Sequence, residues 1–125
     1  MKYIFFFIFI LITFSVNAKW EKVGENDITN NFVDLESKKR SGEFSILWLM
    51  FDYKFIEQVK GKSYISRKQK QQFDCENNFS RRLFFSLHSK FKGKGEEVYK
   101  DKTVEEWKPN INGSVIEKLS KIACN

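Results

Sequence analysis

Apolar and polar residues alternate along most of the chain with the two-residue period of β-strands. The alternation is strongest over residues 43–55, where Phe44 and Trp48 fall on one face and Leu47 on the other. Apolar residues on both faces predict a central strand that is covered on both sides. The same period predicts further strands at residues 20–23, 28–35, 63–75, 80–91 and 96–102.

Clusters of charged residues, glycine and asparagine separate these segments. Lys38–Gly42 and Lys60–Lys62 are expected to form turns. Glu76–Asn78 is expected to form a hairpin turn, because asparagine tolerates the left-handed backbone region. Residues 63–75 and 80–91 should therefore pair as an antiparallel hairpin.

The period changes to that of a helix near the C-terminal end. Ser114 and Glu117 have the spacing of a capping box, and apolar residues follow at helical intervals up to Ala123. One face of this helix is apolar and is expected to pack on the sheet. The sequence predicts one α+β domain over residues 19–125, with an antiparallel sheet of five or six strands and a C-terminal helix.

The first eighteen residues have the pattern of a secretory signal peptide. Lys2 precedes an apolar run from Tyr3 to Ile12, and Val16-Asn17-Ala18 offers small residues to a signal peptidase. The run is shorter than the roughly 20 residues that span a bilayer, although an uncleaved anchor is the alternative. We expect an exported protein that starts at Lys19. A lipoprotein is not expected, because a lipid anchor needs a cysteine at that position.

Export and charge together narrow the class of partner. The chain has a net charge of +6, and loss of Lys2 with the signal lowers it to +5. A positive protein outside the cytoplasm is suited to acidic protein surfaces, sulfated glycans or other anionic polymers. Nucleic acid is not an expected partner. The expected location is the periplasm or the medium, with the cell surface as a further possibility.

The chain has two cysteines, Cys75 and Cys124. In an exported protein, two cysteines favour one intramolecular disulfide. A redox pair or half of a metal site is the alternative, but there is no C-x-x-C spacing and His88 is the only histidine. The disulfide would bring the end of the helix back to the middle of the sheet.

No pattern in the sequence points to catalysis, a metal or a cofactor. His88 falls on the polar side of an alternating strand and is expected to be solvated. Asp52 and Asp74 lie in or beside apolar strands, where a structural role is the simpler interpretation. The pairs at 96–97 and 105–106 are expected to be solvated loop charges, because adjacent strand residues point to opposite faces.

The most distinctive polar feature is a basic hairpin over residues 63–82. Its cations are expected to come close together across the turn, and one of the two paired arginines should share a face with the lysines. This surface could bind a polyanion or an acidic protein, or it could only protect a sheet edge against aggregation. The five candidate binding residues are Arg67, Lys68, Lys70, Arg81 and Arg82.

The order of these features resembles the surface-adhesin protein E family of exported bacterial proteins. The residues that carry the resemblance are Trp20, Val33-Asp34, Leu47-Trp48-Leu49, Asp52-Tyr53, Ser63-Tyr64-Ile65-Ser66, Phe73-Asp74-Cys75, Arg81-Arg82, Trp107, Pro109, Gly113-Ser114 and Cys124. The resemblance implies an antiparallel sheet with a C-terminal helix, a Cys75–Cys124 bridge, and a binding role at the bacterial surface or in the periplasm. The chain departs from the lipid-anchored adhesin of the family, because it has Lys19 where that protein has its lipidated cysteine.

We therefore expect a non-enzymatic binding or adhesion protein of the bacterial envelope. Its partner would be a host or envelope protein, or a sulfated or otherwise anionic polymer. The alternatives are a periplasmic accessory protein with no adhesin role, and a small-ligand carrier with a pocket between sheet and helix. The oligomeric state is left open.

Overall fold

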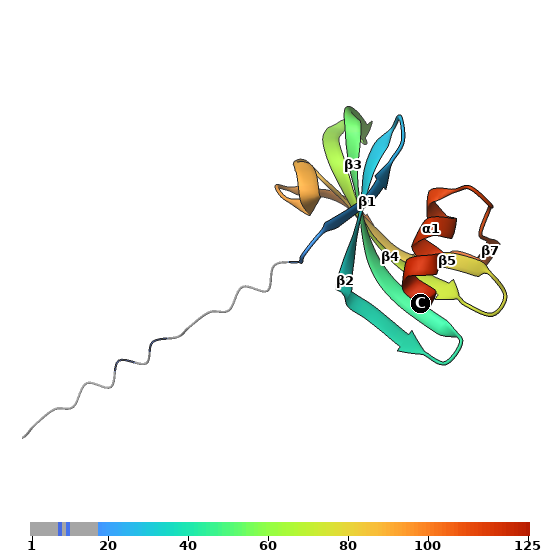
Figure 1. Ribbon diagram of the computed structural model, residues 1–125. Coiled ribbons are helices and arrows are strands. Elements are labelled where there is room, and N and C mark those ends of the chain that lie inside the picture. Colours follow the sequence, from blue (N-terminus) through green and yellow to red (C-terminus); the bar gives the residue numbers. More distant parts are fainter. Residues whose placement is uncertain (1–7, 9, 11–17) are drawn as a thin grey trace, which may run out of the picture.

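The computed structural model describes residues 8, 10 and 18–125, so the predicted signal peptide lies almost wholly outside the described residues. The described part contains one antiparallel sheet and a single α-helix at the C-terminal end (Figure 1). The elements are β1 (Glu21–Glu25), β2 (Thr29–Ser41), β3 (Phe44–Val59), β4 (Lys62–Asp74), β5 (Phe79–His88), a 3-10 turn η1 (Phe91–Gly93), β6 (Glu97–Asp101), β7 (Lys108–Pro109) and α1 (Val115–Cys124).

The strands follow one another in the sheet in chain order, from β1 to β6. Each is antiparallel to the next, and the two-residue β7 pairs with the start of β5 at Phe79 and Ser80. The α+β prediction is confirmed. The sequence does not predict β7, because Pro109 indicates a break; proline is tolerated there at the outer edge of the sheet.

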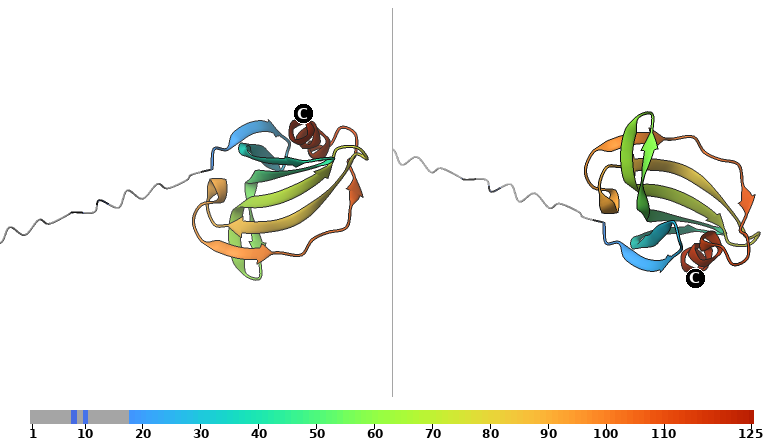
Figure 2. Two further views of the ribbon diagram at one scale, coloured as in Figure 1. Left: turned by 90° about the horizontal axis from the view of Figure 1, so that it is seen from below. Right: turned by 90° about the horizontal axis from the view of Figure 1, so that it is seen from above.

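Bulges bend the long strands and curl the sheet. The pairing shifts between Asp34 and Lys39 on β2, and between Asp52 and Glu57 on β3. Extra residues on one strand increase its local twist, and Figure 2 shows the sheet curling with α1 against it at one end. Lys38–Arg40, expected in a turn, instead belongs to β2, and the turn is at Gly42.

The main apolar core lies between the sheet and α1. Val33, Leu47, Leu49 and Phe73 point to the same side of three neighbouring strands and are fully buried. They pack against α1, whose Leu119 and Ala123 are also fully buried. We call this side of the sheet the helix face. Truncating a leucine in such a core to alanine typically costs about 2–5 kcal/mol.

Both ends of α1 are anchored. At its start the Ser114 hydroxyl accepts a hydrogen bond from the Glu117 amide at 3.2 Å, as the capping box predicts, while the Glu117 carboxylate accepts from the amide of Gly113 at 3.1 Å. At its end Cys124 forms the disulfide with Cys75, which confirms the expected pairing. Arg40 also donates to the Cys124 carbonyl at 3.0 Å. A cation at this position complements the helix dipole.

The opposite side of the sheet is covered only at one end. There the segment 89–95 folds back, and the amide of Lys92 donates to the Asp52 carboxylate at 2.8 Å while that of Gly93 donates to the Ser66 hydroxyl at 3.0 Å. Gly93 has φ +68°, and a side chain there would come within 2.7 Å of Met50, which is fully buried below it.

The rest of that side lies beyond this covering segment, and we call it the open face. Its residues are half-buried, so the central strand at 43–55 is fully covered at Leu47 and Leu49 on the helix face but only partly covered on the open face. They are Phe44, Ile46, Trp48, Lys68, Lys70, Gln72, Arg81 and Phe84.

Replacing Cys124 by serine should lower the free energy of unfolding by about 2–4 kcal/mol, because the bridge closes a long loop and restricts the unfolded chain. The sequence separation of the two cysteines is 49. Urea unfolding curves under oxidising conditions measure the change. Reduced wild-type protein is the matched control and should unfold with the variant, whereas equal midpoints for the variant and the oxidised wild type would contradict the prediction.

Candidate functional site

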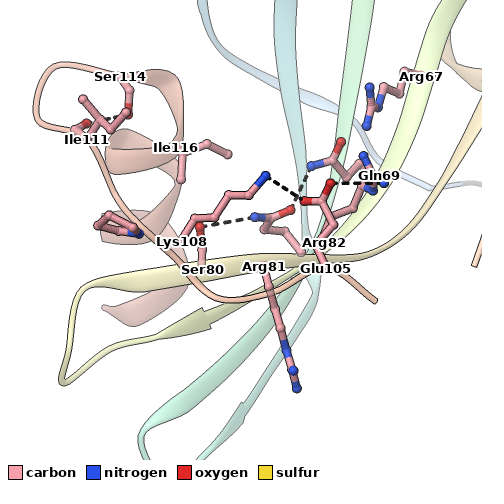
Figure 3. A pocket seen from close by; sticks show the side chains of 12 residues that line it. Arg67, Gln69, Ser80, Arg81, Arg82, Glu105, Lys108, Ile111, Ser114 and Ile116 are labelled. Carbon is pink, nitrogen blue, oxygen red and sulfur yellow. Dashed lines mark hydrogen bonds and ion pairs between the residues drawn. The ribbon is translucent and has the colours of Figure 1, made fainter. Parts of the chain in front are cut away.

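The basic hairpin is the place where the sequence predicts a binding surface, and strand register distributes its five cations between two faces. Cross-strand partners share a face. Arg82 is opposite Gln71, and Arg81 is opposite Gln72, so the two adjacent arginines point to opposite sides of the sheet. Figure 3 shows the Arg81 side chain directed away from Arg82. Arg67 and Arg82 lie on the helix face, and Lys68, Lys70 and Arg81 lie on the other side.

A tight turn fixes this hairpin. The Asp74 carboxylate accepts hydrogen bonds from the backbone amides of Glu76 and Asn77, and from the Asn77 side chain at 2.9 Å. The Asn77 hydrogen bonds lower the pKa of Asp74 below its ordinary value. Asn78 adopts a positive φ of 58°, as expected for an asparagine in such a turn. Asp74 thus has the structural role that the sequence predicts.

Aromatic rings accompany the cations on the open face. The Lys68 ammonium lies 5.6 Å from the centre of the Trp48 ring, and Trp48 packs edge-on against Phe84. The Arg81 guanidinium lies 4.4 Å from the centre of the Trp107 ring. Both distances fit cation–π contacts.

A shallow hollow of about 180 Å³ adjoins Trp48. It is lined by Ala18, Trp20, Asp34, Trp48 and Lys68. All three tryptophans of the chain, Trp20, Trp48 and Trp107, therefore adjoin the open face. Asp34 is the acidic residue of the hollow, and its carboxylate accepts from the amide of Glu36 at 3.1 Å.

Among the residues that the structure describes, Arg82 is the one member of the predicted set that forms ion pairs with carboxylates. On the helix face, Arg82 lies 3.2 Å from the Glu105 carboxylate and 3.9 Å from that of Asp101. Within residues 18–125, neither Lys68, Lys70 nor Arg81 forms an ion pair with a carboxylate. The charge of the open face is therefore available to a partner molecule.

A pocket of about 540 Å³ occupies the helix face beside the start of α1 (Figure 3). It lies between β4, β5 and the segment that leads from β7 into the helix, where the carrier alternative expects a pocket. The residues that line it are Arg67, Gln69, Gln71, Ser80, Arg81, Arg82, Glu105, Lys108, Pro109, Ile111, Ser114 and Ile116. Arg67, Arg81 and Arg82 of the predicted set therefore line this pocket, although the Arg81 side chain is directed away from Arg82 (Figure 3). Sequence reasoning missed its remaining residues, because β7 and the path of 102–114 carry no local signal.

His88 is buried, so the expectation that it is solvated was wrong. Its side chain is 6% exposed, and its Nε2 atom lies 2.7 Å from the Ser86 hydroxyl. The physical reason is the segment 89–95, which folds over this end of the sheet and contacts Ser66, the cross-strand partner of His88. A serine and histidine at this distance could form a nucleophile and base, but Ser86 is also buried, and a substrate has no access. The pair is a satisfied structural contact.

The described residues show neither a cluster of metal ligands nor a membrane-spanning helix. In that part of the chain, no three histidine, cysteine or acidic side chains are grouped as metal ligands. Among the helices found there, none is both long and apolar enough to cross a membrane.

Comparisons with known proteins agree with this architecture. The sequence model of a family described as surface-adhesin protein E matches residues 20–125. A second crystal form of Haemophilus influenzae protein E has a TM-score of 0.70 at 14% sequence identity, covering 88% of this chain and 90% of that one. Another structure of the same protein has a TM-score of 0.65 at 14% identity, covering 88% and 86%.

Protein E from non-typeable Haemophilus influenzae has a TM-score of 0.65 at 15% identity, covering 88% of this chain and 78% of that one. No curated protein has significant sequence similarity to the chain. At these identities, the structural likeness shows the fold.

Burial of His88 should make stability depend on pH. Burial, and the nearby Lys68, lower the pKa of His88, whereas in the unfolded chain it is about 6.5. Between these two values the unfolded state binds more protons, so the free energy of unfolding should fall as the pH is lowered from 7 towards 5. Urea unfolding across this range measures the slope.

The matched variant for this measurement is His88→Gln, which should have a flatter profile. The pKa of Glu43 is raised by its hydrogen bond to Glu76, but that pair is present in both proteins and its contribution cancels. Parallel profiles for the two proteins would contradict the assignment to His88.

Proposed function

Because the chain belongs to the surface-adhesin protein E family, we propose that it is an exported binding protein of the adhesin type whose open face docks a polyanionic partner. The observation that carries the proposal is a group of three cations, Lys68, Lys70 and Arg81, set among aromatic rings on an accessible sheet face. In the described part of the chain, none of the three has a carboxylate partner. The proposal refines the basic-hairpin hypothesis, because it assigns Arg67 and Arg82 to a different surface.

The aromatic rings restrict the cations before a partner binds. Arg81 is held between the Trp107 ring and the side-chain carbonyl of Gln72, to which its Nε donates at 2.8 Å. Lys68 is held near Trp48. Long cationic side chains usually lose conformational freedom on binding. Contacts that already restrict them reduce this cost, which favours a binding role over simple protection of an edge.

Among polyanions, a sulfated or carboxylated glycan fits this face best. The Arg81 guanidinium can bind a sulfate or carboxylate with two parallel hydrogen bonds. The exposed parts of Trp48 and Phe84 offer flat apolar surface to a sugar ring. An acidic protein segment would use the same charges but would have less need of the tryptophan rings. It is the second outcome that the experiment below distinguishes.

Export is part of this proposal. The pattern of residues 1–18 supports secretion and cleavage after Ala18. We expect protein recovered from the cell envelope or the medium to begin at Lys19, and intact mass spectrometry measures this directly. A recovered species that retains Met1 to Ala18 would contradict cleavage and favour an uncleaved anchor.

Replacing Lys68, Lys70 and Arg81 together by glutamine should weaken binding to heparin, used as the sulfated probe, by about tenfold or more at low salt. The wild-type affinity should itself fall with salt, because the Debye length shortens from about 30 Å at 0.01 M to about 8 Å at 0.15 M. Isothermal titration calorimetry at both salt concentrations measures the affinities.

The matched control replaces Lys94, Lys102 and Lys121 by glutamine. These exposed lysines lie off the open face, and their loss removes the same number of charges. Equal weakening in both triple variants would mean that net charge alone causes binding, which contradicts the proposed face. Polyglutamate binding as tight as that of heparin would favour an acidic protein partner.

A further inference from the structure

The pocket on the helix face is separate from the open face, and we infer that it binds a small amphipathic carboxylate: an organic acid with one carboxylate and an apolar body. The inference goes beyond the proposed function, since the two surfaces lie on opposite sides of the β4–β5 hairpin. It rests on three features of the pocket: its size, its arginines and its apolar end.

The first feature is the size of the pocket. A volume of about 540 Å³ falls within the range of about 300–1,000 Å³ that is typical of small-molecule sites. Strands β4 and β5 form the floor, and the segment from Glu105 to Ser114 forms a wall that ends in the first turn of α1 (Figure 3). The pocket is therefore framed by regular elements at its base and by the helix start at its side.

The polar side chains on the floor of the pocket already form hydrogen bonds with one another. The Gln69 side-chain amide donates to the Gln71 carbonyl oxygen at 2.8 Å, and the Gln71 amide donates to the Ser80 hydroxyl at 3.2 Å. All three side chains are buried. A buried chain of hydrogen bonds is rigid and holds these groups in place. The recognition of a ligand must then come mainly from the charged groups around the floor.

The charged groups favour an anion. Four basic residues line the pocket, Arg67, Arg81, Arg82 and Lys108, and one carboxylate, Glu105. The Arg81 side chain is directed away from Arg82 (Figure 3), which leaves three cations for a ligand. Glu105 is shared by Arg82 at 3.2 Å and Lys108 at 3.7 Å. Within the described residues, Arg67 has no carboxylate partner. One negative charge on a ligand would therefore reduce the excess of positive charge.

The two arginines also have unmet hydrogen-bonding capacity. The Nε atoms of Arg67 and Arg82 are buried, and neither has a hydrogen-bond partner in the part of the chain that the structure describes. Their guanidinium groups both contact the ring of Phe85, at 4.1 and 4.4 Å from its centre, so one aromatic side chain positions both arginines. Because these Nε atoms are covered, a carboxylate would bind through the terminal N–H groups of a guanidinium, two of which can donate to it at the same time.

The other end of the pocket is apolar. Pro109, Ile111 and Ile116 face it, and the Ile111 residue is 72% exposed despite its size. An exposed isoleucine at the mouth of a pocket offers contact to an alkyl or aryl group. A ligand with a charged head and an apolar body would therefore satisfy both ends, whereas a small inorganic anion would use only one.

The test is an NMR titration of the ¹⁵N-labelled protein with octanoate. Butanoate lacks most of the apolar body, and octylamine carries the opposite charge, so both should bind at least about tenfold more weakly than octanoate. Amide shifts should centre on Gln69, Gln71, Ser80 and Ile111. The same titration with N-acetyl-leucine compares two sources of the carboxylate. Tighter binding of N-acetyl-leucine than of octanoate would indicate a peptide-type acid, and weaker binding would indicate an alkyl acid.

Arg67→Gln should weaken octanoate binding by about tenfold, because it removes a charge-assisted hydrogen bond. Lys108→Gln is the second variant; its side chain is mostly exposed, so it should fold, and it should weaken binding by about threefold. Lys70→Gln is the matched control, because Lys70 lies on the opposite face of β4, the strand that carries Arg67, and does not line the pocket. It should leave octanoate binding unchanged while weakening heparin binding.

These variants also separate the inference from the proposed function. Loss of heparin binding with octanoate binding retained in the control variant would support both surfaces as separate sites, and the converse pattern in Arg67→Gln would support the pocket. The inference is overturned if octylamine binds as tightly as octanoate, if shifts fall outside the pocket, or if folded Arg67→Gln and Lys108→Gln both bind octanoate as tightly as wild type.

Discussion

The packing of α1 on the helix face, closed by the Cys75–Cys124 bridge, is the constraint on which the rest of the molecule depends. A helix of ten residues has little stability of its own in water. Without it, the fully buried side chains of Leu47, Leu49 and Phe73 would face solvent. The helix also fixes the end of the segment from 102 to 114, which passes along β5 and forms a wall of the pocket. The bridge therefore supports the wall of a pocket that lies at the other end of the helix.

Side-chain alternation along β4 and β5 divides one basic stretch into two chemically different surfaces. Arg81 and Arg82 are adjacent in sequence, yet Arg81 contacts Trp107 on the open face and Arg82 contacts Glu105 on the helix face. The pairing of β5 with β4 shifts by one residue between Arg82 and Phe84. Because of this bulge, Arg82 and Phe85 lie on the same side of the sheet, where they are in contact. Among the described residues, the cations of the open face have no carboxylate partners, whereas on the helix face Glu105 and Asp101 partly neutralise the charge of Arg82.

Local patterns were sufficient to predict much of the fold. Alternation located the long strands, the Ser114–Glu117 spacing located the helix start, and two cysteines in a chain with a signal-like leader predicted the bridge. The remaining features depend on contacts between distant segments. The folding of 89–95 over Met50, the burial of His88 and the pairing of Arg82 with Glu105 follow from the tertiary path of the chain, which has no signature at those residues.

The placement of the tryptophans has a spectroscopic consequence. Trp20, Trp48 and Trp107 all adjoin the open face, and none of them lines the pocket on the helix face. The intrinsic fluorescence of the protein therefore comes from indole rings beside Lys68 and Arg81. A polyanion that covers these rings would change their emission directly, while a small acid in the pocket would leave it almost unaltered. The protein thus carries its own optical reporter for one of its two surfaces.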